Sequence, residues 1–343
     1  MSVDEVNNTS FTRPTEAPLT PSSAFLWAFA FDDGLAEPLT DETLQARGGF
    51  VHGWIWVHLP LSDQRARSYV ERHLELPEPA REMILGAESR VQVQFAGDWA
   101  YGVLPDLKRD LDGHAQGAGR LQFAFGARHL ITARRHALQC VDDLRRKVQG
   151  GANFNSPSDA WVELVEVFID TAERRLHDLG EAVDRIEDQL LGDDDETDGL
   201  ALGPLRRELS RQHRDLLALR SALGRATLPR ATHMLTVLTE QLPRLVHEVE
   251  DLDRESRGLQ DRARLVHEEI DTRIAAGANR SMRTLTVMST LLIPPTLIVG
   301  AFGMNLAGIP FASGHFGFAK AILLCVTVVV GAYAMLRRWR ILS

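Results

Sequence analysis

Two long apolar segments lie close together near the C-terminus, Leu285–Phe302 and Phe318–Leu336. Each is close to the length of about 20 residues that a helix needs to cross the hydrocarbon core of a membrane. Basic residues stand before the first segment and after the second, whereas the connection Gly303–Gly317 has no Asp, Glu, Lys or Arg. The pattern predicts two transmembrane helices, over about 284–302 and 318–336. By the positive-inside rule both termini are cytoplasmic and the connection is outside.

Upstream of these segments, aliphatic residues recur at alternating steps of three and four, which is typical of helices that pack along one apolar stripe. Three such frames can be followed: Leu176–Leu190, Leu205–Leu223 and Leu245–Ile270. Between Gly258 and Pro294 the only helix-breaking residue is Gly277. The third frame is therefore predicted to continue into the first transmembrane segment as one helix of about 50 residues or more.

In the N-terminal part of the chain, the apolar runs are short and are separated by Gly and Asp. Strands are predicted over Phe25–Phe31, Trp54–Leu59, Val91–Phe95, Trp99–Leu104, Leu121–Phe125 and His129–Thr132. Helices are predicted near Ser62–Leu74 and Pro77–Gly86. The expected fold is an α/β cytoplasmic domain followed by long stalk helices and two C-terminal transmembrane helices. The predicted division is a disordered tail (1–23), the α/β domain (24–155), the stalk (156–283), the membrane part (284–336) and a basic cytoplasmic tail (337–343).

Charge separates the membrane part from the rest. None of the 47 acidic residues lies between Ser281 and Ser343, whereas five of the 38 basic residues do. The C-terminal segment is therefore +5 and the preceding body is −14. An acidic body argues against nucleic acid as a partner, because phosphate contacts need clustered Lys and Arg, and it is compatible with attracting cations. The N-terminal tail has no basic stretch followed by an apolar run, so no signal peptide is expected.

The first apolar segment carries a polar stripe. Residues at steps of three or four fall along one helical face: Asn279, Met282, Thr286, Thr290, Ile293, Thr296 and Gly300. Hydroxyl groups in membrane helices often hold neighbouring helices together, and they can equally line a pore; periodicity alone favours neither. Two helices cannot enclose an aqueous path, so a pore would require several copies around an axis. Pro294-Pro295 is predicted to loosen the hydrogen-bond ladder in the middle of the span.

A short motif stands at the end of the same segment. Gly303-Met304-Asn305 is followed by Gly308-Ile309-Pro310, before the last helix. This arrangement resembles the CorA family of divalent-cation transporters, which carry Gly-Met-Asn at this point. The resemblance extends back through Asn279, Met282, Leu285, Thr286, Thr290, Pro294, Thr296 and Gly300. Within the family, the Gly-x-Pro tail of the connection is more similar to the zinc-transporter (ZntB-like) branch than to the magnesium/cobalt branch.

The resemblance implies a homopentamer in the inner membrane of a bacterium, with an axial pore for a divalent cation. It implies that Gly303, Met304 and Asn305 form a selective ring at the outer mouth. The implied pore lining is Asn279, Met282, Leu285, Thr286, Thr290, Ile293, Thr296 and Gly300. A strongly hydrated dication gives up its water reluctantly, so neutral amide and carbonyl oxygens can accept hydrogen bonds from that water instead. Met282, Leu285 and Ile293 would form apolar constrictions that gate by dewetting.

The sequence does not show which cation is carried. A site that strips water from zinc would be expected to use His, Cys or carboxylate, and the first span has none. His315 in the connection is a candidate contact for an incoming ion, although a lone His is more often an ordinary loop residue. Cys325 is interpreted as a small apolar residue. Zn²⁺ is favoured by the resemblance, with Mg²⁺, Co²⁺, Ni²⁺ and Cd²⁺ as other possible substrates, and no cofactor is expected.

Carboxylates are dense along the predicted stalk, and Glu248, Asp251, Glu268 and Asp271 are candidates for sensing the cytoplasmic metal level. In this hypothesis, carboxylates of adjacent subunits bind the ion, which relieves their mutual repulsion. A solvated face of a long helix is the more common explanation for such a pattern.

Three functions remain to be compared. The first is a Zn²⁺ transporter, and its nearest rival is a Mg²⁺/Co²⁺ channel of the same family. A membrane-anchored coiled-coil sensor without conduction is a third possibility, but it would need neither the polar stripe nor Gly303-Met304-Asn305. An enzyme is not expected, because His136, His177, His213 and His247 are scattered without metal-ligand spacing.

Overall fold

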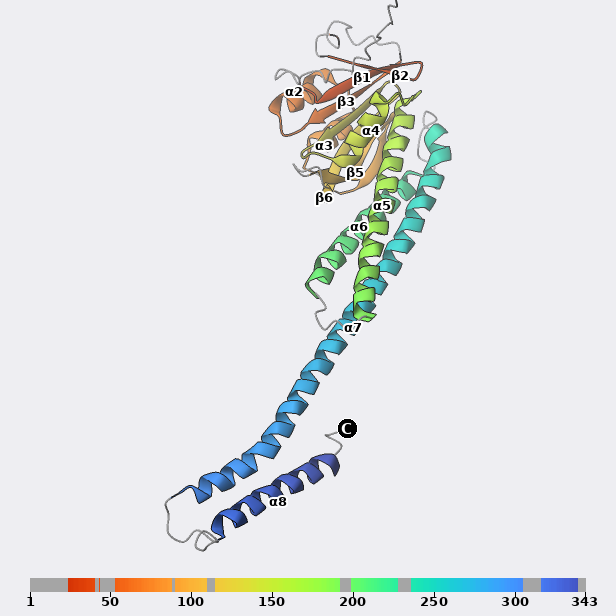
Figure 1. The fold of residues 1–343 in the computed structure, drawn as a ribbon. Coiled ribbons are helices and arrows are strands. Elements are labelled where there is room, and N and C mark those ends of the chain that lie inside the picture. The colour runs from red at the N-terminus through yellow and green to blue at the C-terminus, as the bar shows by residue number, and fades with distance from the viewer. Residues whose placement is uncertain are drawn as a thin grey trace, which may run out of the picture. The chain divides into compact units, whose positions relative to one another are not determined.

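The computed structural model describes residues 24–40, 43, 53–87, 90–109, 115–191, 199–227, 236–304 and 316–338 (Figure 1). The predictions made for the tail 1–23, Asn305, 308–310, His315 and 339–343 lie outside these residues. The chain forms two compact units, and each is described by itself. Unit 1 comprises Met1–Asp188 with Leu200–Ala263, and unit 2 comprises Gln189–Gly199 with Arg264–Ser343.

Unit 1 contains a seven-stranded mixed sheet with the order β2-β1-β3-β7-β6-β5-β4. Its strands are β1 (Trp27–Asp32), β2 (Leu35–Pro38), β3 (Trp54–Pro60), β4 (Gln92–Ala96), β5 (Trp99–Arg109), β6 (Ala115–Phe125) and β7 (His129–Arg134). The central strands β3 and β7 run parallel, with Val57 opposite Ile131, and all other pairs are antiparallel. The expected α/β domain is thus confirmed as a sheet whose central strand β3 is buried along nearly its whole length.

One face of the sheet packs against two short helices, α2 (Gln64–His73) and α3 (Glu78–Leu85). Alternate strand residues such as Ile55 and Val57 meet Val70 of α2 and Ile84 of α3 in one apolar core. This alternation follows from the two-residue period of a strand. Asp63 caps the N-terminus of α2, because its carboxylate accepts a hydrogen bond from the Arg65 backbone N–H at 2.8 Å.

The opposite face is aromatic and lies under helices α4 (Gln139–Gln149) and α5 (Pro157–Leu191). Trp161 of α5 is fully buried, with its ring centroid 5.5 Å from those of both Phe123 and Phe125 on β6. Burial of this large ring fixes the start of α5 on the sheet. His58 is also fully buried, and burial holds its pKa well below the usual value, so it is a neutral core residue.

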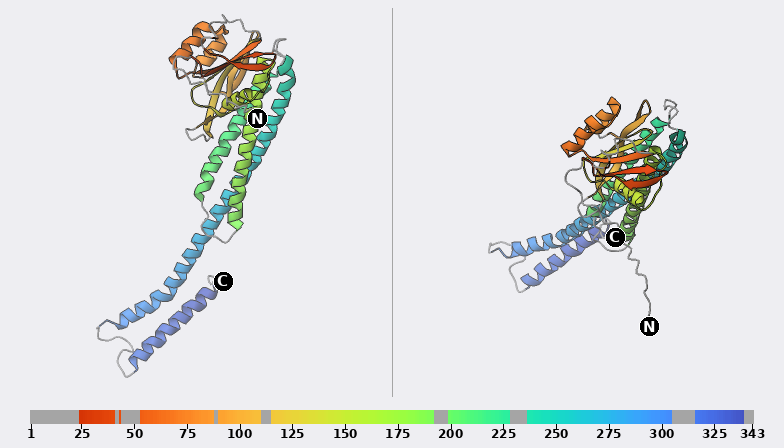
Figure 2. Two further views of the ribbon diagram at one scale, coloured as in Figure 1. Left: turned by 45° about the horizontal axis from the view of Figure 1, so that its top comes forward. Right: turned by 90° about the horizontal axis from the view of Figure 1, so that it is seen from above.

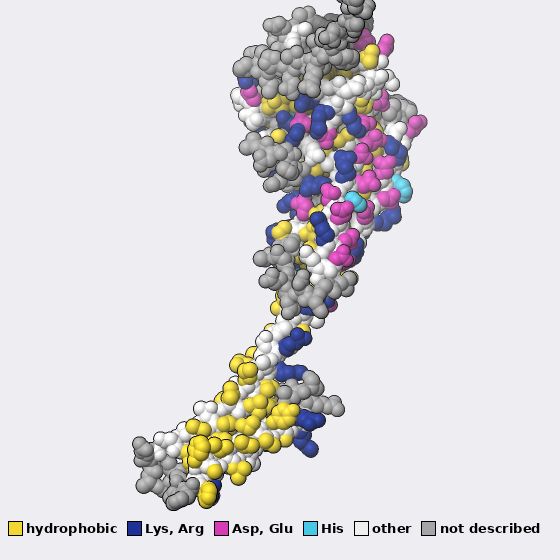
Figure 3. All heavy atoms as spheres, in the orientation of Figure 1, with side chains coloured by type: hydrophobic (Ala, Val, Ile, Leu, Met, Phe, Trp, Pro, Cys, Tyr) yellow, Lys and Arg dark blue, Asp and Glu magenta, His cyan; other side chains and the backbone are white. Residues whose placement is uncertain are grey.

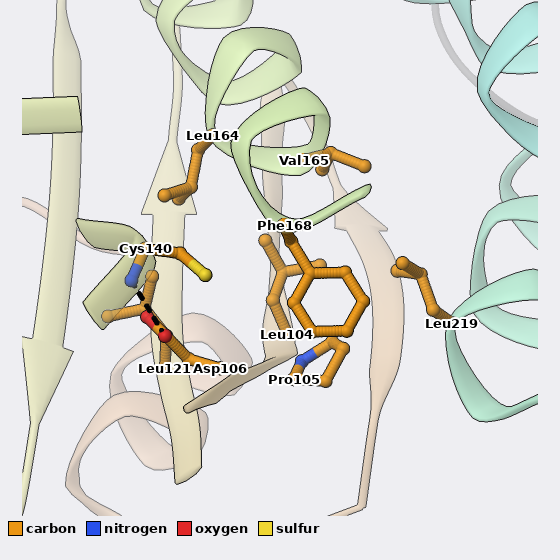
Figure 4. Close-up of a pocket in the computed structure, with 9 residues that line it drawn as sticks. All are labelled: Leu104, Pro105, Asp106, Leu121, Cys140, Leu164, Val165, Phe168 and Leu219. Carbon is orange, nitrogen blue, oxygen red and sulfur yellow. Dashed lines mark hydrogen bonds between the residues drawn. The ribbon is translucent and has the colours of Figure 1, made fainter. Parts of the chain in front are cut away.

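The N-terminus of α4 is capped by a residue that is distant in the sequence. Asp106 of β5 accepts hydrogen bonds from the backbone N–H groups of Cys140 (2.9 Å) and Val141 (3.3 Å), as Figure 4 shows for Cys140. The adjoining apolar cavity of about 10 Å³ has room for one water molecule at most. Burial raises the pKa of Asp106 to about 6, although the backbone N–H groups act in the opposite direction. This site is therefore part of the fold and not a ligand pocket.

The raised pKa predicts a pH dependence of stability. Folded Asp106 binds its proton more tightly than the unfolded residue does, so its stabilising contribution is present below about pH 4 and is lost as the pH rises through about 6. The loss corresponds to about 3 kcal/mol. Asp106→Asn is expected to remove this slope from urea unfolding midpoints measured between pH 4 and 7. Asp98→Asn, at an exposed turn, should retain the slope; an unaltered slope in Asp106→Asn would contradict the assignment.

Three helices complete unit 1: α5, α6 (Gly199–Ala226) and the N-terminal part of α7 (Thr236–Phe302). They lie side by side in both views of Figure 2. The predicted apolar frames are the buried stripes between them, since Val183, Leu209, Leu216, Leu245 and Val249 are essentially inaccessible. Between α6 and α7, Asp253 is also completely buried. Its carboxylate lies 2.6 Å from Arg257, 3.3 Å from Arg220 and 3.0 Å from His213.

Unit 2 contains the rest of α7 and helix α8 (Gly317–Arg338), which lies alongside the C-terminal part of α7 in every view. Helix α7 has 67 residues and is continuous through Pro294-Pro295, as the sequence predicted for one long helix. Both α7 and α8 contain a segment that is long and apolar enough to cross a membrane. The expected order of sheet domain, long helices and C-terminal apolar helix is confirmed.

Candidate ion pathway

The polar stripe of α7 is open to its surroundings in unit 2. Met282, Leu285 and Ile293 are 67%, 64% and 64% exposed, and Thr286, Thr296 and Gly300 are also exposed. Thr290 is half-buried at the edge of the stripe. These side chains are therefore free to face an aqueous path or another subunit.

Helix α8 covers a different face of α7. The less exposed residues of α7 in this region include Val287, Leu291, Pro294, Ile298 and Phe302, which recur at steps of three and four. Successive helical residues are rotated by about 100°, which places this group on roughly the opposite side of α7 from Met282, Ile293 and Gly300. The polar stripe and the face beside α8 are thus different sides of α7.

The covering face of α8 consists largely of small residues, which the sequence reasoning did not identify. The half-buried positions along α8 include Gly317, Ala321, Cys325, Val328 and Ala332, and Leu336 is buried. Small side chains allow two membrane helices to approach closely. Cys325 belongs to this seam, as expected for a small apolar residue. Spacing of small residues by four was the signal that could have revealed it.

In the polar stripe, the hydroxyls of Thr286, Thr290 and Thr296 each donate to the carbonyl oxygen four residues earlier. The distances are 2.8 Å for Thr286 to Met282, 2.8 Å for Thr290 to Thr286 and 2.7 Å for Thr296 to Leu292. A hydroxyl has one donor and two acceptor positions, so its donor is satisfied within the helix while its lone pairs remain. These oxygens can therefore accept hydrogen bonds from the water around a cation.

Pro294 and Pro295 add two further acceptors. Proline has no backbone N–H, so the carbonyls of Thr290 and Leu291 lack their usual helical donors. A carbonyl without a helical partner needs a neighbour or water at membrane depth. The helix remains continuous through both prolines, and these two carbonyls lack only their usual donors four residues later.

The signature motif begins where α7 ends. The Gly303 N–H donates to the Val299 carbonyl at 2.9 Å, and Met304, the last described residue of this segment, is 54% exposed. Asn305 lies outside the described residues. The motif is thus at the end of the same helix that carries the threonine stripe.

The candidate sensing carboxylates are each close to a basic side chain on α7. In unit 1, Glu248 lies 3.1 Å from Arg244, and Asp251 lies 2.6 Å from Arg254. In unit 2, Glu268 lies 2.9 Å from Arg264, and Asp271 lies 3.7 Å from His267. This pairing along one helix is what a solvated helical face produces.

Glu248 and Asp251 also line an acidic groove of about 460 Å³ between α5 and α7. The other acidic residues of the groove are Glu163, Glu166, Asp170, Glu173 and Glu255. Figure 3 shows acidic side chains gathered along this part of unit 1. Within the described part of the chain, no three His, Cys, Asp or Glu side chains are arranged to hold a metal ion. The structure therefore brings two of the four candidates into one groove without forming a metal site.

Comparison with known proteins identifies the family. The family model described as "CorA-like Mg2+ transporter protein" matches residues 51–338. The chain belongs to this CorA-like family. Its members transport divalent cations, so the chain is a divalent-cation transporter of a membrane and not an enzyme. The cation is its substrate and not a resident cofactor.

Curated relatives include the zinc transport proteins ZntB of Yersinia enterocolitica and Klebsiella pneumoniae. The first is 24% identical over 282 residues, covering 80% of this chain and 84% of that protein. The second is 24% identical over 327 residues, covering 93% and 95%. The similarity therefore extends over most of this CorA-like chain.

Solved structures confirm the fold. The full-length CmaX protein has a TM-score of 0.78 at 18% identity, with 92% of this chain and 98% of that chain covered. The complete CorA magnesium transporter of Methanocaldococcus jannaschii has a TM-score of 0.71 at 19% identity, with 91% and 97% covered. The ZntB cytoplasmic domain of Vibrio parahaemolyticus has a TM-score of 0.61 at 12% identity, with 74% and 98% covered.

Proposed function

We propose that this CorA-like protein is a homopentamer that carries Zn²⁺ across a bacterial inner membrane through an axial pore lined by α7. The observation that carries this proposal is the exposed stripe of α7, which bears threonine oxygens and no charged group from Thr284 to Met304. The stripe lies opposite the face covered by α8. Because one stripe cannot enclose a path, copies of α7 must surround an axis.

The proposed route has acceptors along its length. The outer ring consists of Gly303, Met304 and Asn305. The next acceptors along the route are the hydroxyls of Thr296, Thr290 and Thr286, and the inner end of the route lies near Asn279. Met282, Leu285, Ile293 and Gly300 provide apolar or open positions between the oxygens. A hydrated dication donates hydrogen bonds through its water, so oxygen acceptors can hold it without complete dehydration.

Zinc is proposed as the substrate because the zinc transport proteins ZntB are similar over most of this chain. The alternative is Mg²⁺, supported by the family description and by the likeness to the Methanocaldococcus jannaschii magnesium transporter. A pathway that holds a hydrated ion through neutral oxygens gives no strong preference between them, since zinc preference normally arises from nitrogen or sulfur ligands.

The proposed orientation places unit 1 and both termini in the cytoplasm. Arginines at the start of the first span and the end of the second favour the cytoplasmic side. In this arrangement residues 24–155 form the cytoplasmic α/β domain, 156–283 the stalk and 284–336 the membrane part. His315 would meet ions at the outer side, and the carboxylates of the acidic groove would face cytoplasmic metal.

Flux measurements with the purified protein in liposomes test the proposal. The wild type is expected to move Zn²⁺ faster than Mg²⁺, and mass measurement of the detergent-solubilised protein is expected to give five subunits. The opposite preference would favour the magnesium alternative. Pentamers that move neither ion would overturn the transport pathway proposed here.

Asn305→Ala tests the outer ring. The variant removes one amide acceptor from each of the five proposed subunits. Because a hydrogen bond that involves a charged group contributes about 1.5 kcal/mol or more, Zn²⁺ flux is expected to fall by at least about tenfold. Val299→Ala is the matched control, because Val299 is 63% exposed on another face of α7. Equal flux in both variants would remove Asn305 from the ion path.

A further inference from the structure

Four arginines form a basic collar at one end of the two apolar helices: Arg280 and Arg283 of α7 with Arg337 and Arg338 of α8. Arg283 and Arg337 each stand about 20 residues from the opposite ends of their helices. At 1.5 Å per residue this is about 30 Å, close to the thickness of the hydrocarbon core. The two arginine pairs therefore reach the same membrane surface.

Among the described residues, no carboxylate pairs with the collar. All four side chains belong to exposed residues, and within the described residues none of them forms an ion pair. Arginines just before the collar are different: Arg264 pairs with Glu268, and Arg273 pairs with Glu269 at 3.0 Å. The sequence contains no Asp or Glu after Asp271. Figure 3 shows Lys and Arg side chains beside the hydrophobic surface of unit 2.

The positive charge of the collar would repel the transported dication. In a pentamer, twenty guanidinium groups would surround the end of a route for dications, and like charges repel. Anchoring and orienting the helices requires a positive side, but it does not require the charge to remain unneutralised. One partner that a membrane offers at this depth is the phosphate of an anionic lipid, which attracts Lys and Arg next to a span.

We propose that the collar binds the headgroup phosphates of anionic phospholipids in the inner leaflet, and that these lipids lower the electrostatic barrier to the transported cation. The regulatory part rests on the proposed function and its orientation, whereas lipid binding does not require transport. Arginine suits this role because its planar fork forms two parallel hydrogen bonds with a phosphate.

Lipid binding is tested on the full-length protein by native mass spectrometry after exchange into detergent with phosphatidylglycerol or phosphatidylcholine. The wild type is expected to retain phosphatidylglycerol in preference to phosphatidylcholine. In R280Q/R283Q/R337Q/R338Q, the ratio of the two retained lipids is expected to fall at least about fivefold. The corresponding four Arg→Lys substitutions keep the charge and should retain most of it. Lys320→Gln, at the other end of α8, should resemble the wild type. Equal retention of both lipids by the wild type would overturn the inference.

The second measurement is cation flux in vesicles of phosphatidylcholine with or without about one third phosphatidylglycerol. Wild-type flux is expected to rise about fivefold with the anionic lipid, and the Arg→Gln variant should respond less because it has no collar to neutralise. Inorganic phosphate added to phosphatidylcholine vesicles should not replace the lipid. An equal lipid response in both proteins would contradict regulation by the collar. Absence of flux in every lipid, with lipid binding intact, would instead contradict the proposed function.

Discussion

Replacing Thr286 and Thr290 together with valine is expected to reduce divalent-cation flux by at least about tenfold. Valine has nearly the shape of threonine but no oxygen, so the variant removes two acceptors per subunit while keeping the side-chain volume. Both hydroxyls already donate within α7, and their loss removes only a weak constraint on the helix itself. Liposome flux of Zn²⁺ and Mg²⁺ measures the effect.

Thr327→Val provides the matched control for this prediction. Thr327 of α8 makes the same hydrogen bond, to Leu323 at 2.8 Å, and it is exposed away from the seam with α7. Its replacement should leave flux near the wild-type value. If the double variant of α7 transports as well as Thr327→Val, the threonine oxygens are helix-packing groups and not part of the path.

Trp161→Ala is expected to have the largest effect on stability, about 3–5 kcal/mol. The indole fills the space between α5 and two phenylalanine rings of β6, so its removal leaves a large cavity and loosens the first turns of α5. Hydrogen–deuterium exchange of the full-length protein should show faster exchange of the α5 amides.

Trp99→Ala tests whether this response is specific. Trp99 is only half-buried, near the end of the sheet, where it stacks with His129 at a centroid distance of 6.2 Å. Its loss should leave exchange in α5 near the wild-type rate. Faster exchange of α5 in both variants would show general destabilisation of unit 1 instead of a specific anchor.

The long elements could be predicted because each has a repeated signal. The stripes through Leu209, Leu216 and Val249 recur often enough to identify helices and their buried faces before any partner is known. The sequence reasoning missed β2 and α4. Strand β2 has only four residues and ends in Pro38. Helix α4 has Leu138 at its N-cap without a side-chain hydrogen bond, since its capping carboxylate comes from Asp106 on β5.

The candidate pathway was likewise predictable only in part. Periodicity identified the polar stripe of α7, but it could not decide between helix packing and pore lining. The structure adds that α8 occupies another face of α7, along a seam through Ala321, Cys325 and Ala332. Small residues give a weak hydropathy signal, and their role becomes visible only when the second helix is placed beside the first. The cation preference could not be predicted from the stripe, because its neutral oxygens do not distinguish Zn²⁺ from Mg²⁺.

The positions of the two native cysteines make this chain suitable for thiol-labelling experiments. Cys140 is a buried residue in the first turn of α4, and burial raises the pKa of its thiol well above the usual value, so little reactive thiolate is present. Cys325 is half-buried in the apolar seam of α8, where a charged water-soluble reagent has poor access. New cysteines placed one at a time along α7 could therefore be read against a nearly silent wild-type background. Reactivity recurring with the period of the stripe would trace the route of water through the membrane.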